Sequence, residues 1–111
     1  MVDIFTQITE ENFAAKVTKA EQTVLVLFYK EGSNSCDIQI PELEAVNKEY
    51  QERVIFARVD VDEQAKLTQQ WQVDAVPTLV FFRNGNEIYR IKGIRMRDKL
   101  RRQLEGVLLT S

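Results

Sequence analysis

The side chains best suited to chemistry gather where a helix is expected to begin. Cys36, the single cysteine of the chain, stands three residues after Ser33 and directly follows a Gly-Ser-Asn-Ser cluster. A thiol near a helix N-terminus meets unpaired backbone N–H groups and the positive end of the helix dipole, which favour the nucleophilic thiolate. A serine hydroxyl has no comparable reactivity near neutral pH unless a base removes its proton. This segment therefore offers one potential nucleophile, the Cys36 thiol.

The composition excludes several classes of function. The 111 residues include one cysteine and no histidine. Ser-His-Asp and Cys-His catalysis, a structural Cys/His zinc site and an internal disulfide are therefore excluded. We expect no metal and no other cofactor. Because secreted scaffolds of this size carry paired cysteines, we also expect a reducing, cytoplasmic location.

Size and hydropathy indicate one soluble domain. With 44% hydrophobic and 29% charged residues, the chain is typical of a single compact domain, here 1–111, and we expect a monomer. The N-terminal segment lacks a basic flank followed by an apolar run. The longest apolar run, 24–29, is far shorter than the roughly 20 residues that a membrane span needs. We expect no membrane association.

Basic side chains concentrate near the C-terminus, within residues 90–102. A strip of this kind is most often a solvated surface. The whole chain carries a net charge of −2, whereas nucleic-acid-binding domains are usually strongly basic, so we expect no nucleic acid as partner. The strip consists of Arg90, Lys92, Arg95, Arg97, Lys99, Arg101 and Arg102.

Hydrophobic periodicity predicts strands and helices in alternation, with Asn84-Gly85 as a hairpin turn between the last two strands. Thr9 and Asp62 are predicted to cap the first and third helices. Pro41 should kink the second helix without ending it. The predicted strands are 4–8, 24–29, 54–61, 78–83 and 87–92, and the predicted helices are 10–20, 32–52, a short one after Asp62, and 96–109.

This order predicts an α/β fold with one mixed five-stranded sheet and helices on both faces, because strands separated by helices pair in parallel and a hairpin adds an antiparallel end. Cys36, Ile40, Leu43 and Tyr50 fall on one stripe of the second helix, so burial of the thiol is expected. Phe81 and Phe82 should pack on opposite faces of the sheet, and Trp71 should be an aromatic at the edge of the core. The predicted apolar face of the last helix comprises Met96, Leu100, Leu104, Val107 and Leu108.

The element order and three segments resemble the thioredoxin family over essentially the whole chain. The resemblance implies the thioredoxin fold. In the family, the turn before the second helix reads Trp-Cys-x-x-Cys, and the first cysteine attacks a substrate disulfide while the second resolves the mixed disulfide. The segments are VLVLFYKEGSNSCDIQIPELE, VIFARVDVDE and WQVDAVPTLVFFRNGNEIYRIKG, which ends at Gly93.

Carried over position by position, the attacking cysteine of the family is Ser33 here and the resolving cysteine is Cys36. The family tryptophan falls on Gly32, and Asn34 and Ser35 lie between the two active positions. Ser33 is instead expected to cap the helix. The turn is thus Ser-x-x-Cys, and dithiol turnover is not expected from the chain as written.

Two further positions depart from the family. Its buried carboxylate, which assists proton transfer to the resolving thiol, falls on Leu27, and the accompanying lysine falls on Arg58. Leucine cannot act as a general base. Arg58, in an otherwise apolar strand, needs a carboxylate, a carbonyl or solvent as partner.

Other family features persist. The resemblance implies a cis bond between Val76 and Pro77, facing the active-site turn. It also implies that the backbone of Val76 hydrogen-bonds an extended substrate segment, a role that needs no thiol. On this basis the expected substrate-binding residues are Gly32, Asn34, Ser35, Val76, Pro77 and Gly93.

Two functions remain open. The first is membership of the thiol-disulfide oxidoreductase lineage, in cell redox homeostasis and protein disulfide reduction, with the nucleophile lost either naturally or by a deliberate Cys-to-Ser change, and with Cys36 left as at most a slow single thiol. The second is a non-catalytic module that binds peptides or proteins, as an adaptor or a holdase does. The implied partners are protein or peptide substrates and a thioredoxin reductase. Iron-sulfur ligation fits poorly, because monothiol relatives that bind clusters keep the first cysteine and lose the second.

Overall fold

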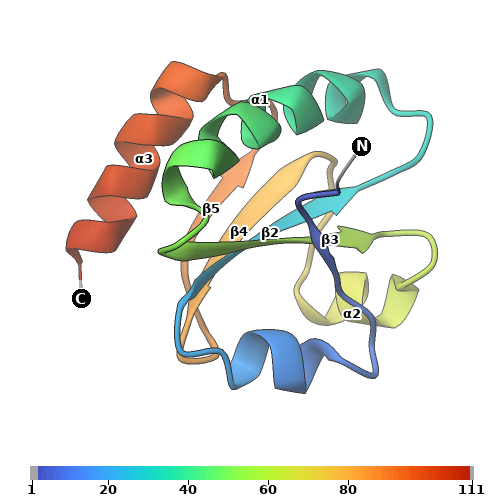
Figure 1. Cartoon of the computed structure of the whole chain (residues 1–111). Helices are drawn as coiled ribbons and strands as arrows, with labels where there is room; N and C mark the ends of the chain where they lie inside the picture. The colour runs from blue at the N-terminus through green and yellow to red at the C-terminus, as the bar shows by residue number, and fades with distance from the viewer. Residues whose placement is uncertain (1–2, 111) are drawn as a thin grey trace.

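The computed structural model describes residues 3–110, so Met1, Val2 and Ser111 of the predicted domain lie outside the described residues. One mixed sheet crosses the molecule in the order β1-β3-β2-β4-β5 (Figure 1). β2 pairs in parallel with β3 and antiparallel with β4, and β5 closes the hairpin. The predicted five-stranded mixed sheet is therefore confirmed. The strands are β1 Thr6–Gln7, β2 Thr23–Tyr29, β3 Val54–Asp60, β4 Thr78–Arg83 and β5 Asn86–Lys92.

Helices cover both faces of the sheet, as predicted. Figure 1 shows α1 (Asn34–Tyr50) and α3 (Arg97–Leu109) on one side of the sheet. The short helix η1 (Ala14–Thr18), which is the first helix of the chain, and α2 (Ala65–Gln70) lie on the other side. Two hydrophobic clusters correspond to these two layers. α1 continues through Pro41 as a single element. Within residues 3–110, no helix has the length and hydropathy needed to cross a membrane.

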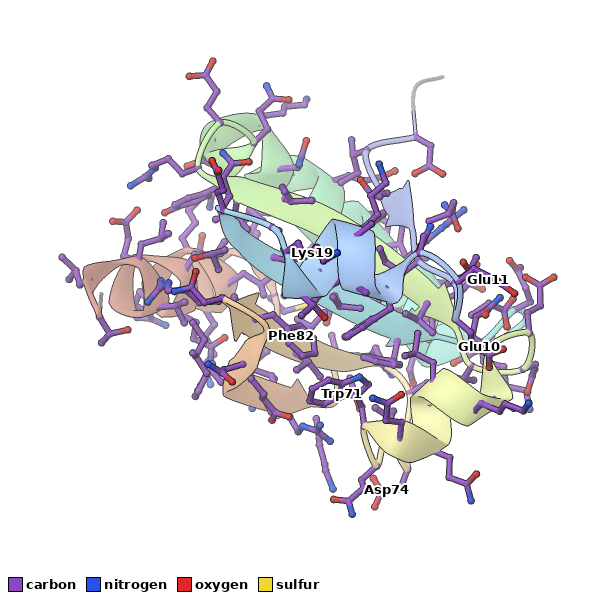
Figure 2. The ribbon with its side chains drawn as sticks, turned by 90° about the horizontal axis from the view of Figure 1, so that it is seen from below. Glu10, Glu11, Lys19, Trp71, Asp74 and Phe82 are labelled. Carbon is purple, nitrogen blue, oxygen red and sulfur yellow. The ribbon has the colours of Figure 1, made fainter. Side chains whose placement is uncertain are left out.

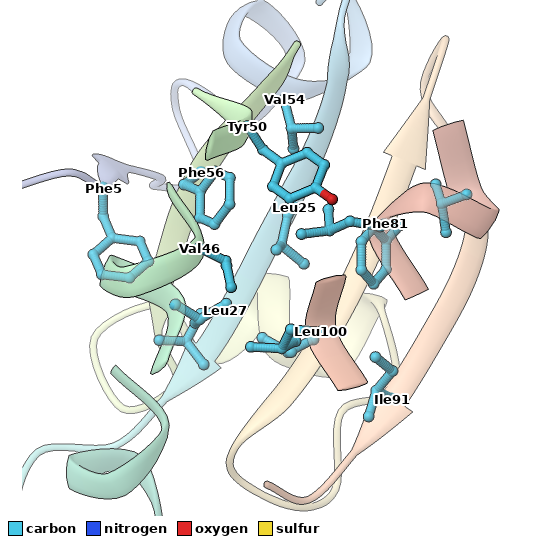
Figure 3. Packing of buried hydrophobic residues seen from close by; sticks show 14 of the residues in the cluster. Phe5, Leu25, Leu27, Val46, Tyr50, Val54, Phe56, Phe81, Ile91 and Leu100 are labelled. Atoms are coloured by element: carbon cyan, nitrogen blue, oxygen red, sulfur yellow. The ribbon is translucent and has the colours of Figure 1, made fainter. Parts of the chain in front are cut away.

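β2 is the centre of the core, because every one of its residues is buried. Alternate side chains of a strand point to opposite faces. Accordingly, Leu25 and Leu27 pack beneath α1 and α3 (Figure 3), whereas Phe28 belongs to the opposite cluster. The same alternation places Phe81 and Phe82 on opposite faces, which confirms the prediction for this pair.

An aromatic group fills the face of the sheet that α2 covers. The Trp71 ring packs edge-on against Phe82 with a centroid distance of 4.8 Å and lies 5.5 Å from the ring of Phe13 (Figure 2). Trp71 is half-buried, in agreement with the predicted place at the edge of the core. Its backbone, just after α2, is held by Arg90 of β5, whose guanidinium donates to the Trp71 carbonyl at 2.7 Å.

Three local predictions were wrong. The first helix is a π-helix, Ala14–Thr18, and is shorter than the predicted 10–20. Thr9 still makes a capping contact ahead of it, because its Oγ1 accepts from the Asn12 N–H and Asn12 Oδ1 accepts from the Thr9 N–H. Asp62 does not cap α2, whose N-cap is Gln64 without a side-chain hydrogen bond. Met96 is 53% exposed, since it precedes α3 with extended backbone and so does not share the helical phase of Leu100.

Candidate functional site

Four loops meet at one end of the sheet because of the strand register. Phe28 near the end of β2 pairs with Thr78 at the start of β4, which sets the turn before α1 beside the Val76–Pro77 loop. The backbone N–H of Gly93 donates to the Pro77 carbonyl at 2.9 Å. That of Val61, after β3, donates to the Tyr29 carbonyl at 3.0 Å. Residues far apart in the chain thus form one surface.

Ser33 begins α1, as predicted. Its backbone is extended, with φ −80° and ψ 121°, and its Oγ accepts a hydrogen bond from the Cys36 backbone N–H at 3.3 Å. A short hydroxyl side chain at this position satisfies one of the unpaired N–H groups of the first turn. Gly32 before it has φ +80°, which favours glycine for reasons of backbone conformation. Asn34 is exposed and Ser35 is half-buried.

Cys36 is closed to solvent. Its side chain is 1% exposed and belongs to the cluster that includes Leu27, Tyr29 and Leu43. The predicted stripe on α1 accounts for this burial, because Cys36 and Leu43 are two turns apart on the same side of the helix. A protein disulfide cannot reach a thiol in this position unless the start of α1 opens.

The strand position below the turn that would hold a base for the thiol is apolar. It is occupied by Leu27, which is fully buried. Arg58, its register partner on β3, forms an ion pair with Asp3 at 3.2 Å, and the Arg58 guanidinium lies over the Tyr29 ring at 5.0 Å. Burial raises the pKa of Tyr29, and Arg58 opposes that shift. The sequence did not identify the partner of Arg58. In the structure its partners are the Asp3 carboxylate and the rings of Phe5 and Tyr29.

The Val76–Pro77 loop presents an unused backbone edge. The Val76–Pro77 peptide bond is cis. Within residues 3–110, neither the N–H nor the C=O of Val76 has a backbone hydrogen-bond partner, and the residue is half-buried. Beside it lies a hollow of about 290 Å³, lined by Val61, Thr68, Val73, Asp74, Ala75 and Val76. An extended segment could pair with Val76 and place a side chain in this hollow.

Glycine keeps both flanks of this surface open. A Cβ built at Gly32 or at Gly93 would meet no atom within 4 Å. Gly93 has φ +87°, so its backbone also favours glycine. The structure thus brings the predicted residues Gly32, Ser33, Val76, Pro77 and Gly93 to one end of the sheet, whereas Cys36 lies beneath them.

Sequence reasoning missed a clamp between α1 and the loop that follows β5. Gln39 is fully buried; its Nε2 donates to the Arg95 carbonyl at 3.0 Å, and its Oε1 accepts from the Arg95 N–H at 2.7 Å. One turn on, Glu42 accepts from the backbone N–H and the guanidinium of Arg97 at 2.8 Å each. The sequence did contain one signal for this contact: Gln39 stands three residues after Cys36, on the buried side of the helix, where a polar side chain needs a partner.

The contact between Glu42 and Arg97 in this clamp makes the stability of the fold depend on pH in the acid range. The Arg97 side-chain hydrogen bond, followed by the Arg97 backbone N–H, lowers the pKa of Glu42 from 4.5 to about 2. Because the folded-state pKa is depressed, Glu42 contributes stability that is complete above pH 4.5 and is lost as the pH falls towards 2. We expect Glu42→Gln to lower the Tm by several degrees at pH 7, and the difference from the parent to shrink as the pH falls towards the pKa of about 2, where half of the Glu42 carboxyls are protonated.

Thermal unfolding followed by circular dichroism between pH 2 and pH 7 would test this expectation. Glu44→Gln is the matched control, since it removes the same charge from α1 and no hydrogen bond or ion pair joins Glu44 to α3 among the described residues. A gap between Glu42→Gln and the parent that stays constant across this range would contradict the assignment.

The basic strip is largely neutralised by neighbouring acids. Arg90 pairs with Glu87, Arg97 with Glu42, and Lys92 and Arg101 also have carboxylate partners. The strip is therefore a surface of local ion pairs. Among residues 3–110, no three His, Cys, Asp or Glu side chains gather in a way that could hold a metal ion.

Comparison with known proteins gives one consistent family. The family described as Thioredoxin matches residues 4–106. A protein named thioredoxin from Chlamydia trachomatis is 33% identical over 93 residues, which are 84% of this chain and 88% of that protein. A thioredoxin-like protein of Synechocystis sp. is 30% identical over 85% of this chain and 90% of its own length. A bifunctional thioredoxin reductase/thioredoxin of Mycobacterium leprae is 29% identical over 92% of this chain but only 22% of its own length.

Proposed function

The chain belongs to the thioredoxin family, and from this premise we propose that it binds extended segments of other proteins without exchanging disulfides with them. Thioredoxins are in general redox oxidoreductases that act on protein substrates together with thioredoxin reductase. The observation that carries the proposal is a contrast within the site. The Cys36 thiol is 1% exposed, whereas the backbone N–H and C=O of Val76 lack a backbone partner within residues 3–110.

Pairing with Val76 requires no reactive group on the partner. An added strand gains affinity from main-chain hydrogen bonds, and alternate side chains of the strand enter neighbouring pockets. The hollow next to Val76 supports this mode of binding. We assign Gly32, Asn34, Ser35 and Gly93 to the surrounding contact surface. Pro77 is buried and shapes the loop beneath this surface, and Ser33 is a helix cap rather than a nucleophile.

The single cysteine also limits the chemistry. Reduction by a thioredoxin reductase requires a disulfide, and one cysteine cannot form an intramolecular disulfide. A reductase therefore has no substrate on this chain unless Cys36 is joined to another molecule. The cytoplasmic location and the monomeric state stay predictions.

A second candidate is slow exchange by Cys36 alone, because Cys36 is the one cysteine of the chain and lies in the first turn of α1. Binding that depends on this thiol would be lost in Cys36→Ala and in excess dithiothreitol. Binding at Val76 would survive both treatments.

The test is an NMR titration of ¹⁵N-labelled protein with reduced and carboxymethylated α-lactalbumin, an unfolded protein without free thiols. We expect shifts of the Val76 and Gly93 amide signals, with the same Kd for the parent and for Cys36→Ala. Absence of any shift at Val76 would overturn the docking role. A parallel titration with scrambled α-lactalbumin, which is unfolded but keeps its disulfides, tests exchange: attack by the Cys36 thiol on one disulfide forms a mixed disulfide and releases one partner thiol. Binding in this titration only when Cys36 is present would favour the second candidate.

A further inference from the structure

The hollow beside Val76 combines an apolar floor with one carboxylate in its lining, and Arg90 and Lys92 of β5 lie nearby. Val61, Val73, Ala75 and Val76 supply most of its lining, and Asp74 contributes the one carboxylate among the lining residues. An apolar floor of this kind can cover the methylene groups of a long side chain.

Further carboxylates belong to residues that neighbour Val61 in the chain. Asp60 and Asp62 come directly before and after Val61, and Glu63 follows them, so that residues 60–76 carry four acidic side chains against a single lysine. One oxygen of Asp60 accepts from the Asp62 and Glu63 N–H groups at 2.9 and 3.2 Å, which fixes this turn. Asp62 and Glu63 are exposed.

Asp74 remains available to a ligand although it has a partner. Its ion pair with Lys92 measures 3.1 Å, but the two side chains are 72% and 56% exposed. Pairs with such exposure are weak and readily exchanged. Figure 2 shows Asp74 at the outer margin of the molecule, beyond Trp71.

We propose that this hollow takes a lysine or arginine side chain of the bound segment. The inference rests on the proposed function, since the segment must first pair with Val76. The methylene groups of the basic side chain would lie on Val61 and Val73, and its charge would reach the carboxylates of Asp62 and Asp74. A leucine would cover the floor without using the acidic rim. A glutamate would be repelled by it.

Three peptides separate these possibilities. Each has the sequence Ala-Ser-Val-Xaa-Val-Ser-Ala with blocked ends, and Xaa is lysine, leucine or glutamate. In NMR titrations of the ¹⁵N-labelled parent we expect the lysine peptide to bind roughly threefold to tenfold more tightly than the leucine peptide, the range that partly exposed ion pairs allow. The glutamate peptide should bind most weakly. The preference for lysine should shrink when the salt concentration is raised from about 0.15 M to about 0.5 M. The reason is screening, because the Debye length falls from about 8 Å to below about 5 Å over this range.

Two variants and a control locate the effect. Asp62→Asn and Asp74→Asn should each weaken binding of the lysine peptide more than binding of the leucine peptide, and so reduce the preference for lysine. Glu21→Gln, an exposed acidic residue that precedes β2 and so lies at the other end of the sheet, should change the Kd of neither peptide.

The outcomes distinguish the docking of the segment from the preference for a basic side chain. If no peptide shifts the Val76 amide, the proposed docking fails and this inference fails with it. If all three peptides shift Val76 with equal Kd, docking stands and the basic-residue pocket is overturned. If Glu21→Gln loses as much of the lysine preference as Asp62→Asn does, the pocket is also overturned. The preference would then come from the overall negative charge of the protein and not from carboxylates at the hollow.

Discussion

Replacing Ser33 by cysteine is expected to raise the disulfide reductase activity of the chain. The new thiol would occupy the N-cap of α1, where the helix N-terminus favours thiolate, with Cys36 three residues further on. Attack on a substrate disulfide forms a mixed disulfide and releases one substrate thiol. Attack by Cys36 then releases the second thiol and leaves a disulfide between the introduced cysteine and Cys36, which dithiothreitol reduces.

The measurement is insulin precipitation in the presence of dithiothreitol, with Ser33→Cys beside the parent and with Ser33→Cys combined with Cys36→Ala as the single-thiol control. We expect a rate at least about tenfold above the parent, because only a thiolate is an effective nucleophile in this exchange. The gain should stay modest, since Leu27 supplies no base for the resolving thiol.

Each outcome of this assay identifies what limits disulfide exchange at the site. Activity in Ser33→Cys would mean that the surface around Val76 still presents a peptide disulfide to position 33, with Ser33 as the change that silences the chain. An inert variant that contains two free thiols and is correctly folded would contradict the expectation. It would place the obstacle in the buried position of Cys36 and in Leu27.

The second large effect concerns the clamp at Gln39. Substitution by leucine keeps the approximate volume of this fully buried side chain but leaves the N–H and C=O of Arg95 without their partner. Loss of a partner costs about 1–3 kcal/mol for each buried polar group. Because Arg95 is half-buried and water can replace part of the loss, we expect the free energy of unfolding to fall by about 2–3 kcal/mol.

Urea unfolding, thermal unfolding and amide hydrogen exchange would measure this change. We expect a Tm lower by roughly 10 °C or more, and faster exchange at the amides of Gly93 and Arg95, because the loop that carries them loses its attachment to α1. Gln69→Leu on α2 is the matched control, since that glutamine is exposed. Equal stability of the Gln39→Leu variant and the parent would show that the two hydrogen bonds contribute nothing net.

Much of the fold followed from local sequence patterns. The continuous apolar run of β2 indicated a strand covered on both faces, and the Asn84-Gly85 pair indicated the hairpin; both local conformations are specified by nearest neighbours. The form of the first helix was not predictable in this way. A hydrophobic pattern indicates which face of a helix is buried, but it does not distinguish a π-helix over Ala14–Thr18 from an α-helix.

The functional groups that the site contains, and those that it lacks, could likewise be predicted from the sequence alone. Three residue types decide this: serine at position 33, where the family has its attacking cysteine, leucine at position 27 in place of a carboxylate, and the absence of histidine. Serine at position 33 leaves a single cysteine and so removes dithiol chemistry whatever the surrounding packing is, whereas leucine at position 27 removes only a base. The Ser33 cap was predictable as well, because it is a contact between residues three apart.

The contacts that hold and shape the site came from the tertiary structure. Asp3 as the partner of Arg58 and the clamp from Gln39 to Arg95 each join residues far apart in the chain. The hollow forms where the loop before β4 returns to the end of β3. Hydrophobic periodicity reports which face of an element is buried, but it does not report what that face meets. Which polar group pairs with which is decided by strand register and helix packing, and these exist only once the sheet has formed.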